Sequence, residues 1–141
     1  MEGMRPIMIE KINSGQECLA MIISKEFGSY GSHFATSLGN PLQVGVIERE
    51  AGDIISAHRH LPIQMNHSGI RQEFLHVMTG KVRVTFFDAE GQQVAERTLG
   101  QGDSLLQISG GHGFHFEEPT RLIEVKLGPY TTLKDDKQRY E

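Results

Sequence analysis

The stretch KVRVTF, residues 81–86, decides how this chain is interpreted. Its apolar residues Val82, Val84 and Phe86 alternate with polar ones, and side chains of a β-strand point alternately to opposite faces. The stretch therefore predicts a strand with one face toward a core and the other toward solvent. The residues at 88–91 that follow are Asp-Ala-Glu-Gly, a composition typical of a hairpin turn.

Short runs of β-forming residues, separated by Gly, Pro and Asp, continue on both sides of this strand. They predict strands at 7–12, 18–24, 43–49, 56–60, 73–78, 81–88, 94–99, 104–108, 113–116 and 121–127. A second turn is expected at 100–103, and the stretches 27–41 and 61–72 are predicted as long loops. The best helix candidate, 132–140, is short and polar. Many short strands joined by turns predict an all-β sandwich or barrel.

Length, charge and cysteine content narrow the class of protein. The chain has 141 residues, which suits one domain with its own core. Its 18 acidic and 14 basic side chains give a formal charge of −4 without any basic run, so we expect no nucleic-acid partner. No apolar run is long enough to span a bilayer and the N-terminus does not resemble a signal peptide, so we expect no membrane partner. The single cysteine, Cys18, cannot form an internal disulfide, which favours a cytoplasmic protein.

Two histidines and a glutamate have the pattern of metal ligands. His58 and His60 are two residues apart, so on a strand both imidazoles would face the same way and could reach one ion. Two exposed polar residues would explain this pair equally well. Glu73 shares its predicted strand face with Leu75 and Val77, which places a carboxylate toward the core. A carboxylate there needs a proton or a cation, and a metal would satisfy it.

A third element carries another histidine after a glycine-rich bend. His112 has the same parity as Phe114 and Phe116, which places it on the apolar face of its strand. His115 has the opposite parity. A shift of register by one residue would exchange the two histidines, so His115 stays open as a rival ligand.

These motifs resemble those of the cupin superfamily. Gly52-x5-His58-x-His60 and Glu73-x6-Gly80 resemble the two ends of the first cupin motif, with a longer gap between them. Gly102-Asp103 and Gly110-x-His112 resemble the second motif, with Ile108 in place of its proline and one residue fewer before the histidine. The tail, from Gly110-Gly-His-Gly-Phe through Glu124-Val-Lys-x-Gly-Pro-Tyr, is similar to a group of small uncharacterised cupins that often accompany surface-glycan pathways.

The resemblance implies a fold and a ligand set. The fold would be a double-stranded β-helix (cupin or jelly-roll) barrel formed by a single domain over 1–141. Its core would span about 43–127, with extra N-terminal strands at 7–24 and a C-terminal tail at 128–141. The implied metal ligands are His58, His60, Glu73 and His112.

The implied cofactor is one divalent transition metal ion. Three imidazoles and one carboxylate suit Fe, Mn, Ni, Zn, Co and Cu, and leave coordination positions open for water or a substrate oxygen. The alternative is a cupin barrel whose histidines line a pocket without metal.

Other polar and aromatic residues are candidates for contact with a ligand. His67, in the loop after His60, and His115 are candidates for an acid or base, since histidine titrates near neutral pH. The candidates for substrate binding are Arg71, Gln43, Gln107, Phe86 and Phe114.

Together these features predict a metal-binding cupin that binds or transforms a small oxygen-rich metabolite, such as a sugar derivative or a carboxylic acid. An enzyme of this kind would be a metal-dependent isomerase, lyase or oxygenase. The alternatives are a non-catalytic module that senses a metabolite or metal, and an accessory homodimeric protein. A homodimer is expected because Phe74 and Met78 would form an apolar stripe on an outer sheet face.

Overall fold

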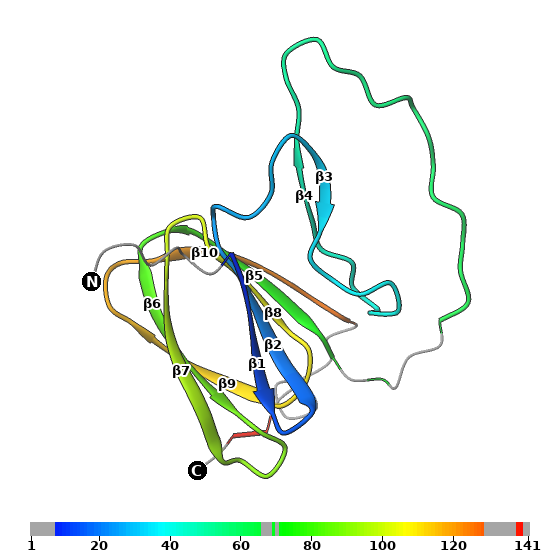
Figure 1. Cartoon of the computed structure of the whole chain (residues 1–141). Coiled ribbons are helices and arrows are strands. Elements are labelled where there is room, and N and C mark those ends of the chain that lie inside the picture. The colour runs from blue at the N-terminus through cyan, green and yellow to red at the C-terminus, as the bar shows by residue number, and fades with distance from the viewer. Residues whose placement is uncertain (1–7, 66–68, 70, 129–137, 140–141) are drawn as a thin grey trace.

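The computed structural model describes residues 8–65, 69, 71–128 and 138–139, which form an all-β protein, as predicted (Figure 1). The strands are β1 (Ile9–Ser14), β2 (Glu17–Ile23), β3 (Gly31–Phe34), β4 (Gly45–Glu48), β5 (Glu73–Thr79), β6 (Lys81–Phe87), β7 (Gln93–Gly100), β8 (Ser104–Gln107), β9 (Gly111–Phe116) and β10 (Arg121–Lys126). In these described ranges there is no helix long and apolar enough to cross a membrane.

Two antiparallel sheets enclose the core. One has five strands in the order β1-β2-β8-β5-β10, and the other has three in the order β7-β6-β9. Val82, Val84 and Phe86 are 0–1 % exposed, which confirms the alternation that predicted this strand. They pack with Leu75 and Leu105 of the five-stranded sheet in one apolar cluster. Burial of this cluster between the two sheets is the main stabilising contribution to the fold.

The predicted turns form where their residues indicated. The Gly91 N–H donates to the Asp88 carbonyl (3.0 Å), and the Asp88 carboxylate accepts from the N–H groups of Glu90 and Gln92. In the second turn the Asp103 N–H donates to the Gly100 carbonyl (3.0 Å). These two turns set the register of β6 against β7 and deliver the chain into β8.

One predicted strand is wrong and one strand was missed. Residues 56–60 form no strand, because no neighbouring strand pairs with them within the described chain and an extended segment alone is not stable as β-structure. The missed strand, β3, lies in the predicted loop 27–41 and pairs antiparallel with β4. Its approach to β4 requires Gly45, because a Cβ there would meet the Phe34 ring at 2.8 Å.

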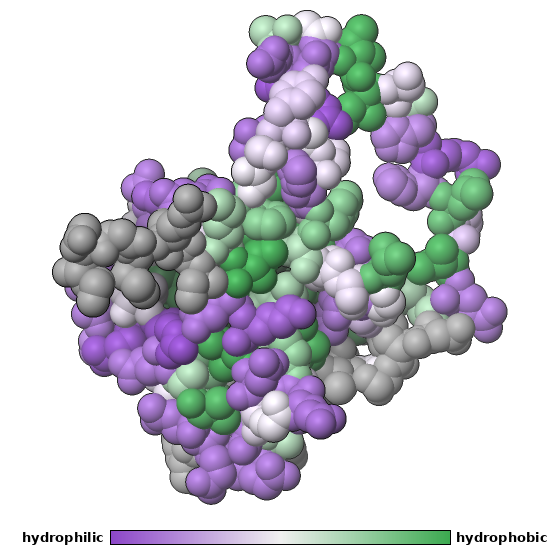
Figure 2. Space-filling view, viewed as in Figure 1, coloured by the Kyte–Doolittle hydropathy of each residue, from purple (hydrophilic) through white to green (hydrophobic). Residues whose placement is uncertain are grey.

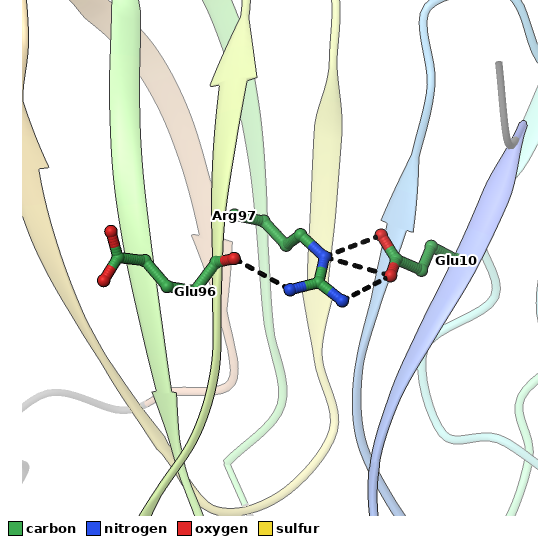
Figure 3. A network of polar contacts seen from close by, with 3 residues as sticks. All are labelled: Glu10, Glu96 and Arg97. Carbon is green, nitrogen blue, oxygen red and sulfur yellow. Dashed lines mark hydrogen bonds and ion pairs between the residues drawn. The ribbon is translucent and has the colours of Figure 1, made fainter. Parts of the chain in front are cut away.

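Within the described residues the two large sheets do not close into a barrel, and their two sides differ. On one side the edges β1 and β7 are joined by Arg97 and Glu10, whose guanidinium and carboxylate approach to 2.8 Å (Figure 3). On the other side β9 and β10 are each hydrogen-bonded to one neighbour only. The open side is where a cavity lies.

Residues 28–65, which we call the arm, stand apart from these sheets. They comprise the two-stranded sheet β3-β4 and the extended segment 50–65 (Figure 1). Paired side-chain amides connect the arm to the sheets: Asn40 Nδ2 donates to Gln72 Oε1 (2.8 Å) and Gln72 Nε2 donates to Asn40 Oδ1 (3.0 Å). The large apolar side chains that the arm exposes are Tyr30, Phe34, Leu38, Ile47, Ile54, Ile55, Leu61, Ile63 and Met65.

Candidate functional site

A cavity of about 870 Å³ lies beside the free edge of β9, between the two large sheets. Its walls come from β5, β8, β9 and β10. The polar and charged side chains that line it are Arg71, Glu73, Gln107, His112, Glu124, Lys126, Gln138 and Arg139, and the aromatic ones are Phe87, Phe114 and Phe116. A concave site that combines convergent polar groups with an apolar wall has the usual form of a small-molecule site.

Glu73 and His112 meet at the wall of this cavity. Glu73 is the first residue of β5, and His112 is the second of β9. His112 Nε2 lies 2.9 Å from Glu73 Oε1, and the side chains are only 16 % and 14 % exposed. The fold thus brings together two residues that are 39 positions apart, one from each sheet.

Gln107 fixes the orientation of the His112 ring. The Gln107 side-chain amide donates to the carbonyls of Ser109 (2.6 Å) and Leu19 (3.3 Å), so its nitrogen must face them. Its Oε1 is therefore the atom 2.8 Å from His112 Nδ1, which must be the protonated donor. The other ring nitrogen, Nε2, then faces the Glu73 carboxylate.

This arrangement requires a positive charge between His112 and Glu73. With its proton on Nδ1, a neutral imidazole has only a lone pair on Nε2, and a lone pair facing a carboxylate oxygen is unfavourable. A second ring proton, donated from Nε2 to Glu73, resolves the conflict. A divalent cation bound by Nε2 and Oε1 would resolve it as well, because both atoms are electron-pair donors.

The surroundings of Glu73 favour its charged form. Burial raises the pKa of the Glu73 carboxyl, but its hydrogen bonds with His112 and Glu124 and the positive charges of His112 and Lys126 lower that pKa more. The resulting pKa is about 2, below the ordinary value of 4.5. Lys126 is the cross-strand partner of Glu73 on β10. At neutral pH the cavity therefore holds a carboxylate rather than a carboxylic acid.

A tight bend at 108–110 delivers His112 to this position. The Ile108 and Ser109 N–H groups both donate to the Leu19 carbonyl, at 2.7 and 3.0 Å. Proline, which the cupin motif has in place of Ile108, could not make the first of these bonds. Gly110 has φ +66°, and a Cβ there would overlap the Phe87 carbonyl oxygen. Glycine is thus required where β9 begins beside β6.

The structure brings together only part of the predicted metal set. Among the described residues no group of three or more His, Cys, Asp or Glu side chains is close enough to hold a metal ion. His58 and His60 lie on the exposed segment of the arm, with their ring centroids 5.2 Å apart. His58 Nδ1 lies 2.8 Å from the Ser56 carbonyl. Glu73 and His112 lie at the wall of the cavity, whereas His58 and His60 lie on the arm. The four side chains in this conformation therefore do not fit one metal ion.

The candidate acid and base residues have different positions. His115 points away from the cavity: its strand partner is Arg83, its side chain is 65 % exposed, and Nε2 lies 3.9 Å from Glu117. The prediction from parity therefore holds on β9: His112 faces the cavity and His115 faces away from it. His67 lies outside the described residues.

The candidate substrate-binding residues are divided between the cavity and other sites. Arg71, Gln107 and Phe114 line the cavity, and Arg71 also donates to the Leu127 carbonyl (2.7 Å). Phe86 is fully buried in the core. Gln43 precedes β4 and closes a loop of the arm, where its side-chain amide donates to the carbonyls of Ser37 and Asn40.

Glu124 and Lys126 are among the cavity residues that were not singled out from the sequence. Glu124 and Lys126 lie on β10 with the parity that places them beside Leu75 and Glu73 of β5. The only signal in the sequence was the strand parity of Arg121–Lys126, which places Glu124 and Lys126 on the same face of the strand. It could not be used, because the sequence does not show that this strand lies against β5.

Comparison of the chain with protein families, with curated proteins and with solved structures finds no match in any of the three.

Proposed function

We propose that this chain is a cupin-type domain that binds, and transforms by proton transfer, a small oxygen-rich metabolite in the cavity at Glu73 and His112. The single observation that supports it is the hydrogen-bonded series Gln107–His112–Glu73 at the cavity wall. A fixed ring orientation, a buried charge and an adjoining cavity are features of binding and catalytic sites rather than of folding alone.

The strand arrangement supports the cupin assignment. Two antiparallel sheets face one another across a single core, and the chain crosses from one large sheet to the other at the short connections β5–β6 and β7–β8. His112 and Glu73, which the cupin resemblance assigned to one site, are in contact. A closed double-stranded β-helix, with a cytoplasmic location in keeping with the single cysteine, completes the proposal.

The cavity chemistry favours an oxygen-rich ligand with an acidic group. Arg71 and Lys126 are at its wall and would bind carboxylate or hydroxyl oxygens, while Phe114 and Phe116 would cover the apolar side of a small ring. A ligand oxygen that replaces Glu73 as acceptor would receive the Nε2 proton of His112. The Glu73 carboxylate would accept the proton from a carbon next to the ligand carbonyl, and its return to another carbon would give an isomerase or, with a leaving group, a lyase.

Ligand stabilisation and deuterium exchange test this proposal. We would measure the melting temperature with a panel of hydroxy acids and sugar acids, then follow exchange of ligand C–H protons in D₂O by NMR. We expect one class of acid to stabilise the protein and to exchange. His112→Ala should abolish both effects, because it removes the proton carrier while leaving the core intact.

His115→Ala is the matched control, since this histidine is on the same strand but on the outer face. It should leave both effects unchanged. Stabilisation without exchange would mark the protein as a binding or sensing module. Stabilisation that persists unchanged in His112→Ala, or is lost equally in His115→Ala, would contradict the proposed site.

A further inference from the structure

The arm has an internal structure of its own. Its two strands, β3 and β4, pair antiparallel, and the Phe34 ring lies over Gly45, where a Cβ would meet it at 2.8 Å. At the other end of this small sheet the Tyr30 hydroxyl donates to Asp53 Oδ2 (2.6 Å) and so holds the turn that follows β4. These contacts fix the arm in a conformation that stands apart from the two large sheets (Figure 1).

The arm exposes more apolar surface than a two-stranded sheet can sustain alone. The nine large apolar side chains named above for the arm are each more than half exposed, and Leu38 is 98 % exposed. Figure 2 shows hydrophobic side chains exposed along this part of the molecule. Together they present roughly 1,000 Å² of apolar surface, against about 800 Å² that each partner buries in a standard protein interface. An isolated two-stranded sheet is marginally stable in water, so a surface of this size indicates an interface.

The outer edge of β4 is open to a further strand. The Ala35 N–H donates to the Val44 carbonyl (2.8 Å), which makes these two residues a hydrogen-bonded pair. Such pairs alternate along an antiparallel ladder, so the backbone of Val46 also faces β3, whereas the backbones of Gly45 and Ile47 face outward. Among the described residues β4 pairs with β3, and through one bridge with the residue before it, and with no other strand. It has neither the Lys or Pro nor the bulge with which edge strands commonly prevent further pairing.

We propose that the chain forms a two-fold dimer through its arms, in which the outer edges of the two β4 strands pair antiparallel. The two arms then share one sheet in the order β3-β4-β4-β3, and the partner is a second copy of this chain. This interface differs from a dimer through Phe74 and Met78, which lie on the outer face of β5. It does not involve the cavity, so it stands independently of the proposed function.

A second copy fits this edge because β4 is compatible with itself in one register. With Val46 opposite the partner's Val46, each Gly45 lies opposite the partner's Ile47, and these two residues exchange both backbone hydrogen bonds. The Phe34 ring lies over Gly45 on the same face, so the partner's Ile47 packs against this ring. A register centred on Glu48 would place two carboxylates opposite one another, which is unfavourable. Pairing about a two-fold axis uses both open edges at once and closes the assembly.

Sedimentation velocity of the full chain over a range of concentrations tests the dimer. We expect the wild type to dimerise and Ile47→Pro to weaken the dimer about 100-fold, because proline removes the N–H that Ile47 donates to the partner. That N–H faces away from β3, so the substitution removes no hydrogen bond of the arm itself. Ile47→Thr is the matched control, since it also removes the exposed isoleucine but keeps the N–H, and it should weaken the dimer far less.

Two outcomes of this experiment would overturn the proposal. One is a wild-type chain that stays monomeric at every concentration, as expected if its own body covers the arm. The other is a dimer that Ile47→Pro leaves intact. If Met78→Glu dissociates such a dimer, its interface lies on the outer face of β5 instead.

Disulfide trapping tests the register and decides the matter even where Ile47→Pro does not fold. In a Cys18→Ala background, Val46→Cys places two cysteines opposite one another on the two-fold axis, in a non-hydrogen-bonded pair whose Cα atoms are about 4.5 Å apart. We expect it to form a covalent dimer rapidly on oxidation. Ile47→Cys is the control, because its two cysteines would be roughly 8 Å apart, beyond the reach of a disulfide. Position 47 is more exposed than position 46, so random collision would give the opposite order. Crosslinking of Ile47→Cys that equals or exceeds that of Val46→Cys would contradict the paired edges.

Discussion

On each side of the paired sheets a basic and an acidic side chain join one sheet to the other, but one of these pairs is exposed to water and the other is largely buried. On the closed side, Arg97 and Glu10 join β1 and β7 with side chains that are 43 % and 26 % exposed. On the open side, His112 and Glu73 join β9 and β5 with side chains that are 16 % and 14 % exposed. Exposed ion pairs contribute little because water competes for both charges. A buried pair costs desolvation and persists only with further hydrogen bonds.

The difference between the two pairs bears on where the proposed site lies in this fold. The exposed pair can connect two edges with little consequence for the rest of the molecule. The buried pair depends on Gln107, Glu124 and Lys126, and it borders a cavity at the edge of β9, which pairs with β6 alone among the described residues. A fold gains little stability from such a pair, and its support by these neighbouring side chains is in keeping with the ligand site proposed above. The predictions below alter first the open side and then the closed side.

The largest effect is expected from Gly110→Ala. A Cβ at Gly110 would overlap the Phe87 carbonyl oxygen, and its φ of +66° is unfavourable for alanine. The bend must shift, which should cost about 2–4 kcal/mol of unfolding free energy and displace His112 from Glu73. Urea denaturation measures the loss. Gly113→Ala is the control, since a Cβ there makes only ordinary contact with the Phe87 ring at 3.9 Å; similar losses in both variants would contradict the argument.

A smaller effect is expected from Gln107→Leu. The leucine fills a similar volume but leaves His112 Nδ1 and the Ser109 carbonyl without their partner. Loss of these buried bonds should cost about 1–3 kcal/mol. It should also free the His112 ring, which the proton-nitrogen correlation spectrum of histidines reports as a mixture of tautomers. Gln93→Leu, an exposed change at the start of β7, should alter neither; an unchanged ring spectrum in Gln107→Leu would refute the orienting role of Gln107.

Local alternation in the sequence predicted most of the fold. The faces of β6 and β5 and the choice of His112 over His115 on β9 follow from parity, which each strand carries within itself. The segment 56–60 has strand-like composition but no partner in its own described chain, and no local signal shows whether a partner exists. The missed β3 is the converse, because a glycine-rich stretch becomes a strand through its pairing with β4.

The candidate site was predictable only in part for a related reason. Glu73 and His112 are recognisable as ligand types, and the cupin resemblance grouped them. The amide of Gln107 is oriented by the Leu19 carbonyl, 88 residues away in the chain, so its role depends on the folded arrangement. Glu10 and Arg97, 87 residues apart, gave no sequence signal for the same reason.

Acid should destabilise the open side through Glu73. Its pKa is about 2 in the folded protein against an ordinary 4.5, so its contribution is fully present above pH 4.5 and is lost as the pH falls toward 2. With allowance for solvent at the cavity, the loss should be about 1–2 kcal/mol. Chemical denaturation at several pH values measures it. Glu73→Gln should flatten this part of the profile, whereas Glu118→Gln, at an exposed pair with Lys81, should not; equal slopes in all three proteins would be inconsistent with a lowered pKa.

The smallest effect is expected on the closed side, from Arg97→Ala. The guanidinium makes three contacts to the Glu10 carboxylate and one to the Glu96 carbonyl (Figure 3), but water reaches both side chains. Its loss should cost about 0.5–1 kcal/mol, and the cost should shrink in high salt because exposed charges are screened. Denaturation at low and high ionic strength measures both. Arg97→Lys keeps the charge without the fork and should fall between the two proteins. A loss as large as that of Gly110→Ala would mean that the closed side determines the stability of the sheets, and the contrast between the two sides would then be reversed.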